Sequence, residues 1–308
     1  MKHINYLFGI LIFVFLLCTV SCNDDENAYK SELYKKVFAL VSADNYNVFT
    51  AVHDLEEPES TGYVSVSCGG TTPTDKDILI NLKLDNDLFD RYNKGNYDVE
   101  ENKYANILPA DKYTIDNYSI TVPAGERSGR MKIRMRPEGL SPDSIYFISL
   151  KIDNYSVYEA NPTKSDILYR VLLKNSYALQ SSSSFATSYS MRGMLGVSNV
   201  MGTKSVFPLT HNSVRVMAGN ETFQADTALI NGRSIILEVD DRNHVTVKPF
   251  KHLYVEQIDG DPDYPNIYFI DDDGFRKFKT FQLRYNYRKA GDATLYEMKE
   301  ELRVELKK

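Results

Sequence analysis

The feature that most constrains this chain is an alternation of apolar and polar residues with a period of two, which recurs over most of its length. Successive side chains of a β-strand point to opposite faces, so this pattern is typical of half-buried strands. The clearest example is the segment 296–306, where only Glu300 interrupts the apolar face. That face comprises Tyr296, Met298, Leu302, Val304 and Leu306. No long amphipathic helical pattern competes with it, so the sequence predicts an all-β protein.

Short alternating segments with turn signals between them fill the first half of the chain, which favours a β-sandwich. The segment Asp87–Asn93 is the one stretch that reads as a short helical turn. The predicted strands are Asn47–Val52, Tyr63–Cys68, Ile78–Leu84, Ser119–Val122, Arg130–Arg136, Tyr146–Ile152 and Leu168–Leu173.

The second half is predicted to form another antiparallel β-domain. Its later strands are long and successive, which favours a meander or a small barrel, with a second sandwich as the alternative. Phe281, Leu283, Tyr285 and Tyr287 would share one face of such a strand. The predicted strands are Ser234–Val239, His244–Pro249, Asn266–Ile270, Phe275–Tyr287 and the segment 296–306.

Charge excludes one class of partner. The chain has 308 residues, with 36 Lys and Arg against 42 Asp and Glu, a formal net charge of −6. Phosphate contacts from Lys and Arg supply most nucleic-acid affinity, so an acidic chain without a basic block is not expected to bind nucleic acid. The chain also has 22 Tyr and no Trp, so any aromatic platform for a ligand would be built from Tyr or Phe.

The N-terminus indicates export. Residues 1–21 combine a short basic start with an apolar run too short for a membrane span, which is typical of a signal peptide. Thr19-Val20-Ser21-Cys22 resembles a bacterial lipobox, in which Cys22 would be lipidated after cleavage. More than one acyl chain gives stable anchoring. The acidic cluster Asn23, Asp24, Asp25 and Glu26 resembles the surface-export signal of Bacteroidetes lipoproteins, and a solvated linker is the alternative.

Composition then divides the rest of the chain. A lipidated tether over 22–31 precedes a sandwich domain over 32–176, and a Ser-rich linker over 177–184 precedes a C-terminal β-domain over 185–308. The run Ser181–Ser184 adds nothing to a core, which places the boundary there. Once Cys18 is removed and Cys22 is lipidated, only Cys68 is left, so no intramolecular disulfide forms. Cys68 shares the apolar face of its strand and is expected to be buried.

The first half resembles a known family in the order of its segments. Leu82–Asn93 is followed by Ile107–Tyr113, then by Ile120–Gly125, a strand, and Tyr146–Ile152. This order is similar to a Bacteroidetes lipoprotein domain of unknown function at the N-terminus of surface proteins from polysaccharide-utilisation systems, some of them family 18-type endoglycosidases. The resemblance covers about residues 35–175. It implies an Ig-like sandwich and a glycan-handling role at the cell surface, and it supplies no binding residue.

Catalytic motifs are not found in the sequence. Gly196-Val197-Ser198-Asn199-Val200 lacks the second glycine of a nucleophile elbow, and there is no phosphate-binding loop or dinucleotide fingerprint. The family 18 catalytic pattern is also missing. Two β-domains without such motifs favour a protein that is not an enzyme. An acid/base pair elsewhere is the alternative, because carboxylates are plentiful.

One loop is the candidate for a metal. Asp259, Asp261 and Asp263 alternate as the first ligands of Ca²⁺ loops do. Tyr264 stands where an EF-hand needs Gly, and Ile270 where it needs Glu, so the loop is not an EF-hand. A solvated turn is expected, with a looser Ca²⁺ site as the alternative. No other cofactor is indicated.

Sugar binding needs aromatic faces and planar polar groups. Tyrosines and arginines in the predicted loops of the second domain, or just after the linker, are therefore the candidate glycan-binding residues, and half-buried strand tyrosines are the alternative reading. The candidates are Tyr189, Arg192, Tyr254, Tyr264, Tyr268 and Arg276.

These observations favour a non-catalytic, lipid-anchored outer-membrane protein that faces the cell exterior and binds a glycan beside importer components. The first domain would be a spacer and the second the binding module. It would touch the membrane only through its lipid anchor. Two alternatives stay open: a structural or adhesive surface protein with a protein partner, and a glycan hydrolase.

Overall fold

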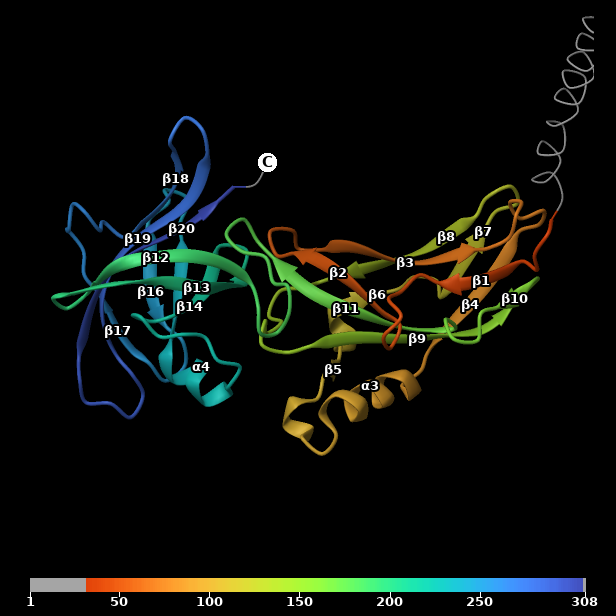
Figure 1. Ribbon diagram of the computed structural model, residues 1–308, viewed down its shortest axis with the longest axis horizontal. Helices are drawn as coiled ribbons and strands as arrows, with labels where there is room; N and C mark the ends of the chain where they lie inside the picture. The colour runs from red at the N-terminus through yellow and green to blue at the C-terminus, as the bar shows by residue number, and fades with distance from the viewer. Residues whose placement is uncertain (1–31, 307–308) are drawn as a thin grey trace, which may run out of the picture.

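The computed structural model describes residues 32–306, which form two β-domains along one long axis (Figure 1). The first core draws on residues from Phe38 to Leu173 and the second on residues from Ala178 to Leu302. The expected signal peptide 1–21, the lipidation site Cys22 and the acidic cluster 23–26 lie outside the described residues. Within residues 32–306, no helix has the length and apolar character needed to cross a membrane.

The N-terminal domain is a β-sandwich of two sheets, as the alternation predicts. The first sheet has the order β10 (Glu159–Ala160), β1 (Val37–Leu40), β3 (Ser60–Cys68), β8 (Ser128–Met135) and β6 (Tyr113–Thr114). The second has the order β2 (Val48–Asp54), β11 (Asp166–Lys174), β9 (Tyr146–Tyr155), β4 (Ile78–Leu84) and β7 (Ser119–Val122), and β5 (Asn106–Ile107) also pairs with β9.

Alternation explains how the two sheets face each other. On β8, Met131, Ile133 and Met135 are buried while Lys132 and Arg134 between them are not. Burial of such apolar side chains is the main source of the free energy that holds the sheets together. Cys68 is 4% exposed in the same core, as expected.

Helix α3 (Asp87–Tyr97) packs on the outer face of the second sheet, against β9 and β11, and is longer than the predicted turn Asp87–Asn93. Leu88 packs with Phe147 and Leu168, so the helix is held by tertiary contacts. It ends at Asp98, whose φ of 48° lies in the left-handed region and whose N–H donates to the carbonyl of Lys94. The sequence pattern missed the last turn because its side chains have no apolar face.

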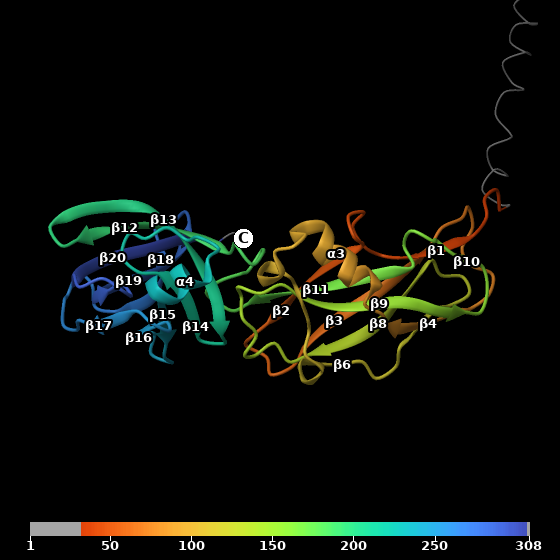
Figure 2. The same ribbon diagram turned by 90° about the horizontal axis from the view of Figure 1, so that it is seen from below.

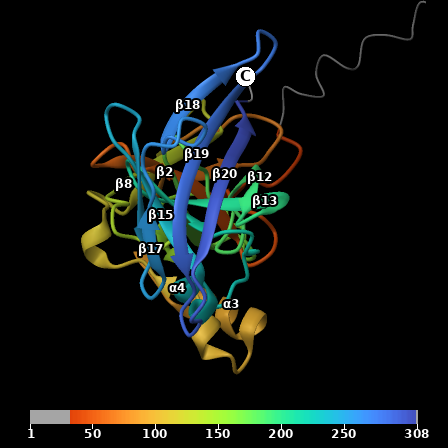
Figure 3. The same cartoon turned by 90° about the vertical axis from the view of Figure 1, so that its left-hand side faces the viewer.

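The C-terminal domain is one nine-stranded antiparallel sheet curled into a nearly closed barrel. Figure 3 shows β18, β19 and β20 running side by side. The spatial order is β16 (Val245–Pro249), β15 (Ser234–Val239), β14 (Ser213–Met217), β13 (Ser198–Thr210), β12 (Thr187–Leu195), β20 (Tyr296–Glu305), β19 (Lys277–Arg288) and β17 (Tyr254–Gln257), and β18 (Ile267–Asp272) also pairs with β19. A bridge between His244 and Ile267 joins the two ends of the sheet.

The interior of the barrel explains why Glu300 interrupts the apolar face of the last strand. Phe281, Leu283 and Tyr285 point inward and are fully buried, as the shared face predicts. Glu300 is also fully buried, and its carboxylate lies 2.5 Å from the Lys204 ammonium and accepts a 2.6 Å hydrogen bond from the Tyr285 hydroxyl. A buried carboxylate needs such partners. Burial lowers the pKa of Lys204 and raises that of Tyr285. The ion pair with Lys204 is the main interaction that offsets the cost of burying the Glu300 carboxylate.

A second helix was not predicted, and the serine run forms a tight loop. Helix α4 (Thr227–Arg233) lies on the same side of the molecule as α3 (Figures 1 and 2). The run Ser181–Ser184 closes on itself, because the N–H groups of Ser181 and Ser182 both donate to the carbonyl of Phe185 at 2.9 Å. Gln180 and Ala186 form a bridge on either side of this loop.

Candidate functional site

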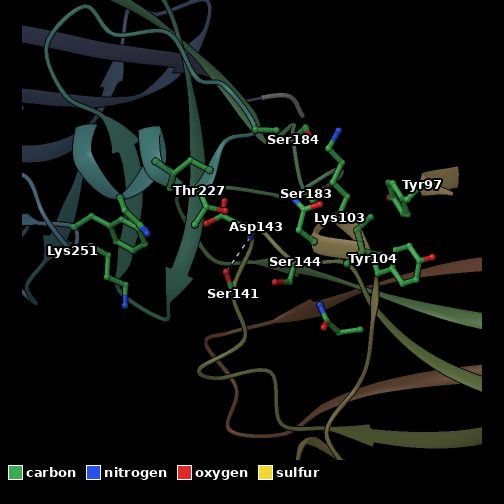
Figure 4. A pocket seen from close by; sticks show the side chains of 17 residues that line it. Tyr97, Lys103, Tyr104, Ser141, Asp143, Ser144, Ser183, Ser184, Thr227 and Lys251 are labelled. Carbon is green, nitrogen blue, oxygen red and sulfur yellow. Dashed lines mark hydrogen bonds between the residues drawn. The ribbon is translucent and has the colours of Figure 1, made fainter. Parts of the chain in front are cut away.

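A concave surface of about 600 Å³ lies at the junction of the two domains (Figure 4), and we name it the junction cleft. Both domains and the loop between them form its walls. It is lined by Tyr97, Asn102, Lys103, Tyr104, Asn106, Ser141, Asp143, Ser144, Ile145, Ser183, Ser184, Ala225, Thr227, Ile230, Asn231, Phe250 and Lys251.

The chain after α3 forms the N-terminal wall. Asn93, buried in α3, donates from Nδ2 to the Ala105 carbonyl at 3.3 Å and accepts from the Ala105 N–H at 2.8 Å. This pair of bonds fixes the backbone next to Tyr104, whose hydroxyl donates to the carbonyl of Asp98 at 2.6 Å. The rings of Tyr97 and Tyr104 lie 6.3 Å apart. The N-terminal wall is therefore a fixed pair of aromatic rings.

A charged pair joins the two domains at the floor of the cleft. Asp143, in the loop between β8 and β9, accepts a hydrogen bond from Nη1 of Arg215 on β14. Arg215 is 1% exposed, and its guanidinium lies 4.8 Å from the ring centre of Phe207 and 5.3 Å from that of Phe250. Cation–π contacts and the ion pair both stabilise this buried charge. The Asp143 carboxylate is thus already neutralised.

Neutral hydrogen bonds brace the same junction. Nε2 of Gln180 donates to the carbonyl of Pro142 at 2.7 Å. Nδ2 of Asn175 donates to the carbonyls of Thr210 and Ser213 at 2.8 and 3.0 Å. Because buried amides that lose their partners are costly, these bonds favour one relative placement of the domains.

Helix α4 forms the opposite wall. Asp226 caps it by accepting from the Leu229 N–H at 2.9 Å. Thr227 and Asn231 are four residues apart and so lie on one face of the helix, towards the cleft. Lys251, at a φ of 57°, adds an ammonium near the ring of Phe250.

The chemistry of the lining is that of a polar, hydroxyl-rich ligand. Among the described residues, the side chains of Asn102, Asn106, Asn231, Ser144 and Thr227 make no protein hydrogen bond, so their donors and acceptors face the cleft unused. Amides and hydroxyls both donate and accept, which matches sugar hydroxyl groups. The lining contains a single carboxylate, that of Asp143. Glycoside hydrolysis in most families uses a pair of carboxylates.

Three of the sequence-predicted residues lie together elsewhere, on the outer face of the barrel. Arg192, Tyr264 and Asp263 line a groove of about 450 Å³, which we name the sheet groove. Arg192 pairs with Glu301 at 2.9 Å. The other lining residues are Gly193, Met194, Asn199, Val200, Met201, Gln282 and Glu301.

The remaining predicted tyrosines and Arg276 do not join either surface. Tyr189 is fully buried, and its hydroxyl donates to the carbonyl of Tyr177. It is therefore a core residue, and it is even more buried than the alternative reading of a half-buried strand tyrosine expected. Tyr268 packs against the ring of Phe281 at 4.9 Å, and burial raises its pKa to about 12. Tyr254 is 44% exposed on β17, and Arg276 is exposed near Glu305.

Two of the three aspartates of the proposed metal loop, Asp259 and Asp261, have side-chain partners of their own. Asp261 is paired with Lys299 and Arg284, each at 2.8 Å, and the hydrogen bonds from Lys299 and from the Asp263 N–H lower its pKa to about 2. Asp259 accepts from the Asn266 side chain at 3.1 Å. Among residues 32–306, no three His, Cys, Asp or Glu side chains are arranged to hold a metal ion. Asp261 is thus engaged as a structural anchor of the loop, which leaves it poorly suited to Ca²⁺.

Sequence reasoning missed the cleft residues. The segment from Tyr97 to Asn106 is rich in Tyr and Asn and follows the one predicted helical turn. That composition could have marked it as a candidate binding segment. Nothing in the sequence pattern brought this segment beside α4, since that contact depends on the domain junction.

Comparisons with known proteins cover both domains. One family model, for an N-terminal domain, matches residues 29–159, and a second, for a C-terminal domain, matches residues 165–303. No protein with a curated description matches the chain.

Solved structures from Bacteroides share the two-domain fold. A multidomain protein from Bacteroides ovatus that includes DUF1735 is 14% identical, with a TM-score of 0.63 over 87% of this chain and 94% of that one. An auxiliary nutrient binding protein from Bacteroides thetaiotaomicron is 13% identical, with a TM-score of 0.60 over 86% and 92%. A Bacteroides ovatus protein of unknown function is 15% identical, with a TM-score of 0.59 over 92% and 94%.

The resemblance of the first domain is thereby confirmed and extended to the second. The chain belongs to the family whose N-terminal and C-terminal domain models match it in succession, and it shares its two-domain fold with solved proteins from Bacteroides.

Proposed function

We propose that this protein is a non-catalytic glycan-binding lipoprotein of the cell surface, and that the junction cleft is its binding site. The observation that carries the proposal is the convergence of two tyrosine rings with unpaired amides and hydroxyls in one concave surface. Rings offer faces for sugar C–H groups, while the amides read hydroxyl positions.

The cleft changes the division of labour between the domains. The first domain was expected to be a spacer, but it supplies Tyr97, Tyr104 and Asn106 to the proposed site. The second supplies Thr227 and Asn231. A ligand in the cleft would touch both domains, and neither domain alone would hold it with full affinity. The name of the nutrient-binding relative supports the same class of function.

The proposed cellular location rests on the N-terminal sequence. Lipidation at Cys22 would hold the protein on the outer membrane, and the acidic cluster Asn23–Glu26 would direct it to the exterior. There it would capture glycan beside importer components. Replacement of Cys22 by Ser should release the protein into the soluble fraction and abolish labelling by a palmitate analogue. Retention in the membrane with undiminished labelling would refute the anchor.

A protein partner is the second candidate. The barrel exposes apolar side chains on two hairpins: Val197 is 95% exposed, Met201 86% and Phe275 93%. Such side chains are common at protein interfaces. A stoichiometric protein complex that forms without carbohydrate, and that is lost on replacing Phe275 by Ser, would favour this function.

Affinity electrophoresis tests the main proposal. A soluble form beginning at Asn23 is run through gels that contain polygalacturonate, xyloglucan, yeast α-mannan or mucin. The Tyr104→Ala, Asn231→Ala double variant should reduce retention about ten- to hundredfold, since one ring contact and one amide are lost. Tyr254→Ala removes an exposed tyrosine outside the cleft and should retain wild-type mobility. No retention of the wild-type chain in any gel would overturn the proposal.

A further inference from the structure

The sheet groove is a second built surface. The strands that line it belong to the C-terminal domain, at the end of the molecule opposite β1 (Figure 1). Four neighbouring strands place one residue each in a row across its floor. Met201 on β13 is the register partner of Arg192 on β12, which is the partner of Glu301 on β20, which is the partner of Gln282 on β19. The floor is therefore set by strand register.

This row lies on the outer face of the sheet. Leu283 and Leu302, the sequence neighbours of Gln282 and Glu301, are buried in the barrel. Because side chains alternate between faces, Gln282 and Glu301 must point to the solvent side. Buried neighbours fix their backbone, so the polar floor is held by the packed core beneath it.

A loop forms the wall above this floor. Asp261 anchors it through Arg284 and Lys299, which belong to the next row of the same sheet. Tyr264 and Asp263, just after the anchor, reach the groove. The Lys299 ammonium lies 5.9 Å from the ring centre of Tyr264, which helps to hold the ring in place. The ring is thus positioned by the ion pairs below it.

The groove offers unused hydrogen-bonding groups beside a ring. Among the described residues, the side chains of Gln282, Asp263 and Asn199 donate and accept no hydrogen bond with protein atoms. Arg192 and Glu301 hold each other and keep further donors and lone pairs free. The groove thus offers one ring, an amide floor and a carboxylate, which are the same kinds of group as in the junction cleft. Its surface is shallow and open along the sheet.

We propose that the sheet groove is a second carbohydrate-binding site, so that one molecule holds a polysaccharide at two separate points. The ligand class rests on the proposed function, and the position rests on the geometry of the groove itself. A polymer that spans both sites binds its second site as an intramolecular event, whereas a short oligosaccharide occupies each site independently. Linked binding of this kind raises affinity by about 10²–10⁴-fold when the geometry permits both contacts.

Native mass spectrometry with short oligosaccharides separates the two sites. The probe is a partial hydrolysate of the polysaccharide that retains the soluble chain most strongly in the four gels. Wild type should bind two oligosaccharides per molecule. Tyr264→Ala with Gln282→Ala should bind one, and so should Tyr104→Ala with Asn231→Ala. Tyr254→Ala, the matched tyrosine control, should still bind two.

The same variants are then compared on the intact polymer. Each pair of substitutions should weaken retention at least about tenfold, and the fourfold variant should run as if no polymer were present. A wild-type stoichiometry of one that is unchanged by the groove substitutions would overturn the second site and leave the cleft intact. Loss of all binding through the groove substitutions alone would refute the cleft and keep the groove.

Discussion

The junction cleft and the sheet groove offer similar chemical groups but are built in different ways. The cleft takes its walls from two domains and depends on how they are held, by Asp143 with Arg215 and by neutral hydrogen bonds. The groove takes its floor from the register of one sheet, whose inner face is a packed core. Ligand binding in the cleft should therefore be sensitive to changes at the domain junction, whereas binding in the groove should be sensitive only to changes in the barrel.

The largest effect is expected from the barrel interior, directly behind the groove. Lys204→Met leaves the Glu300 carboxylate fully buried without its cation, which should destabilise the C-terminal domain by about 3–5 kcal/mol. Denaturant unfolding measures the loss. The double variant Lys204→Met, Glu300→Leu should recover most of it, because no charge then remains buried. A single variant as stable as wild type would contradict a stabilising role for the pair.

A change at the junction should separate the two surfaces. Arg215→Ala removes a 1% exposed cation and leaves Asp143 without its partner, at a cost of about 3 kcal/mol. We expect cleft binding to disappear and the groove to retain its oligosaccharide in native mass spectrometry. Calorimetry verifies that both domains still unfold cooperatively. Equal loss at both surfaces in a folded variant would show that they are not independent.

A smaller change tests the N-terminal wall alone. Asn93→Ala deletes the side chain that bonds both backbone groups of Ala105, leaving them unsatisfied at a cost of about 1–3 kcal/mol. Tyr104 lies next to Ala105, so the ring should lose its fixed position. We expect weaker binding in the cleft and unchanged binding in the groove, by titration calorimetry. Asn96→Ala, in the same helix but exposed, is the matched control.

The smallest effect concerns pH. The hydrogen bond from Lys299, first among several, lowers the pKa of Asp261 from 3.8 to about 2. A carboxyl group with a lower pKa in the folded state contributes stability that is complete above pH 3.8 and is lost as the pH falls towards 2. Groove affinity should therefore stay constant from pH 8 to 5. A decline within that range, in a protein that remains folded, would show that another group controls the loop.

Much of the fold could be predicted from the sequence, because the alternation of apolar and polar residues indicates which face of each strand is buried. The strands β4, β7 and β15 match their predicted ranges. The strands β12 and β13 were missed since glycines and uncharged polar residues blur the pattern there. The strand β14 was missed because it is buried on both faces and contains Arg215, a charge that only the cation–π contacts and Asp143 make tolerable.

The candidate surfaces were harder to predict for a physical reason. Arg192 was chosen as an arginine just after the linker and Tyr264 as a tyrosine in a predicted loop, and only the structure shows that they line one groove. Glu300 was seen as an exception, but its partner Lys204 is 96 residues away and only barrel closure brings them together. Tyr97 and Asn231 line the same cleft from two different domains. Local patterns carry no information on contacts of that range.

The arrangement along one axis has a mechanical consequence. The N-terminal strand β1 lies at one end, the junction in the middle and the hairpin of β12 and β13 at the other end (Figure 1). If the chain is tethered at its N-terminus, tension from a polymer held in the groove must pass through the junction. The load there falls on the bonds of Arg215, Gln180 and Asn175, whereas each β-ladder shares its load over many bonds. Because resistance to force is set by the rate of opening, the strength of that junction would limit how hard a captured polymer can pull before the domains separate.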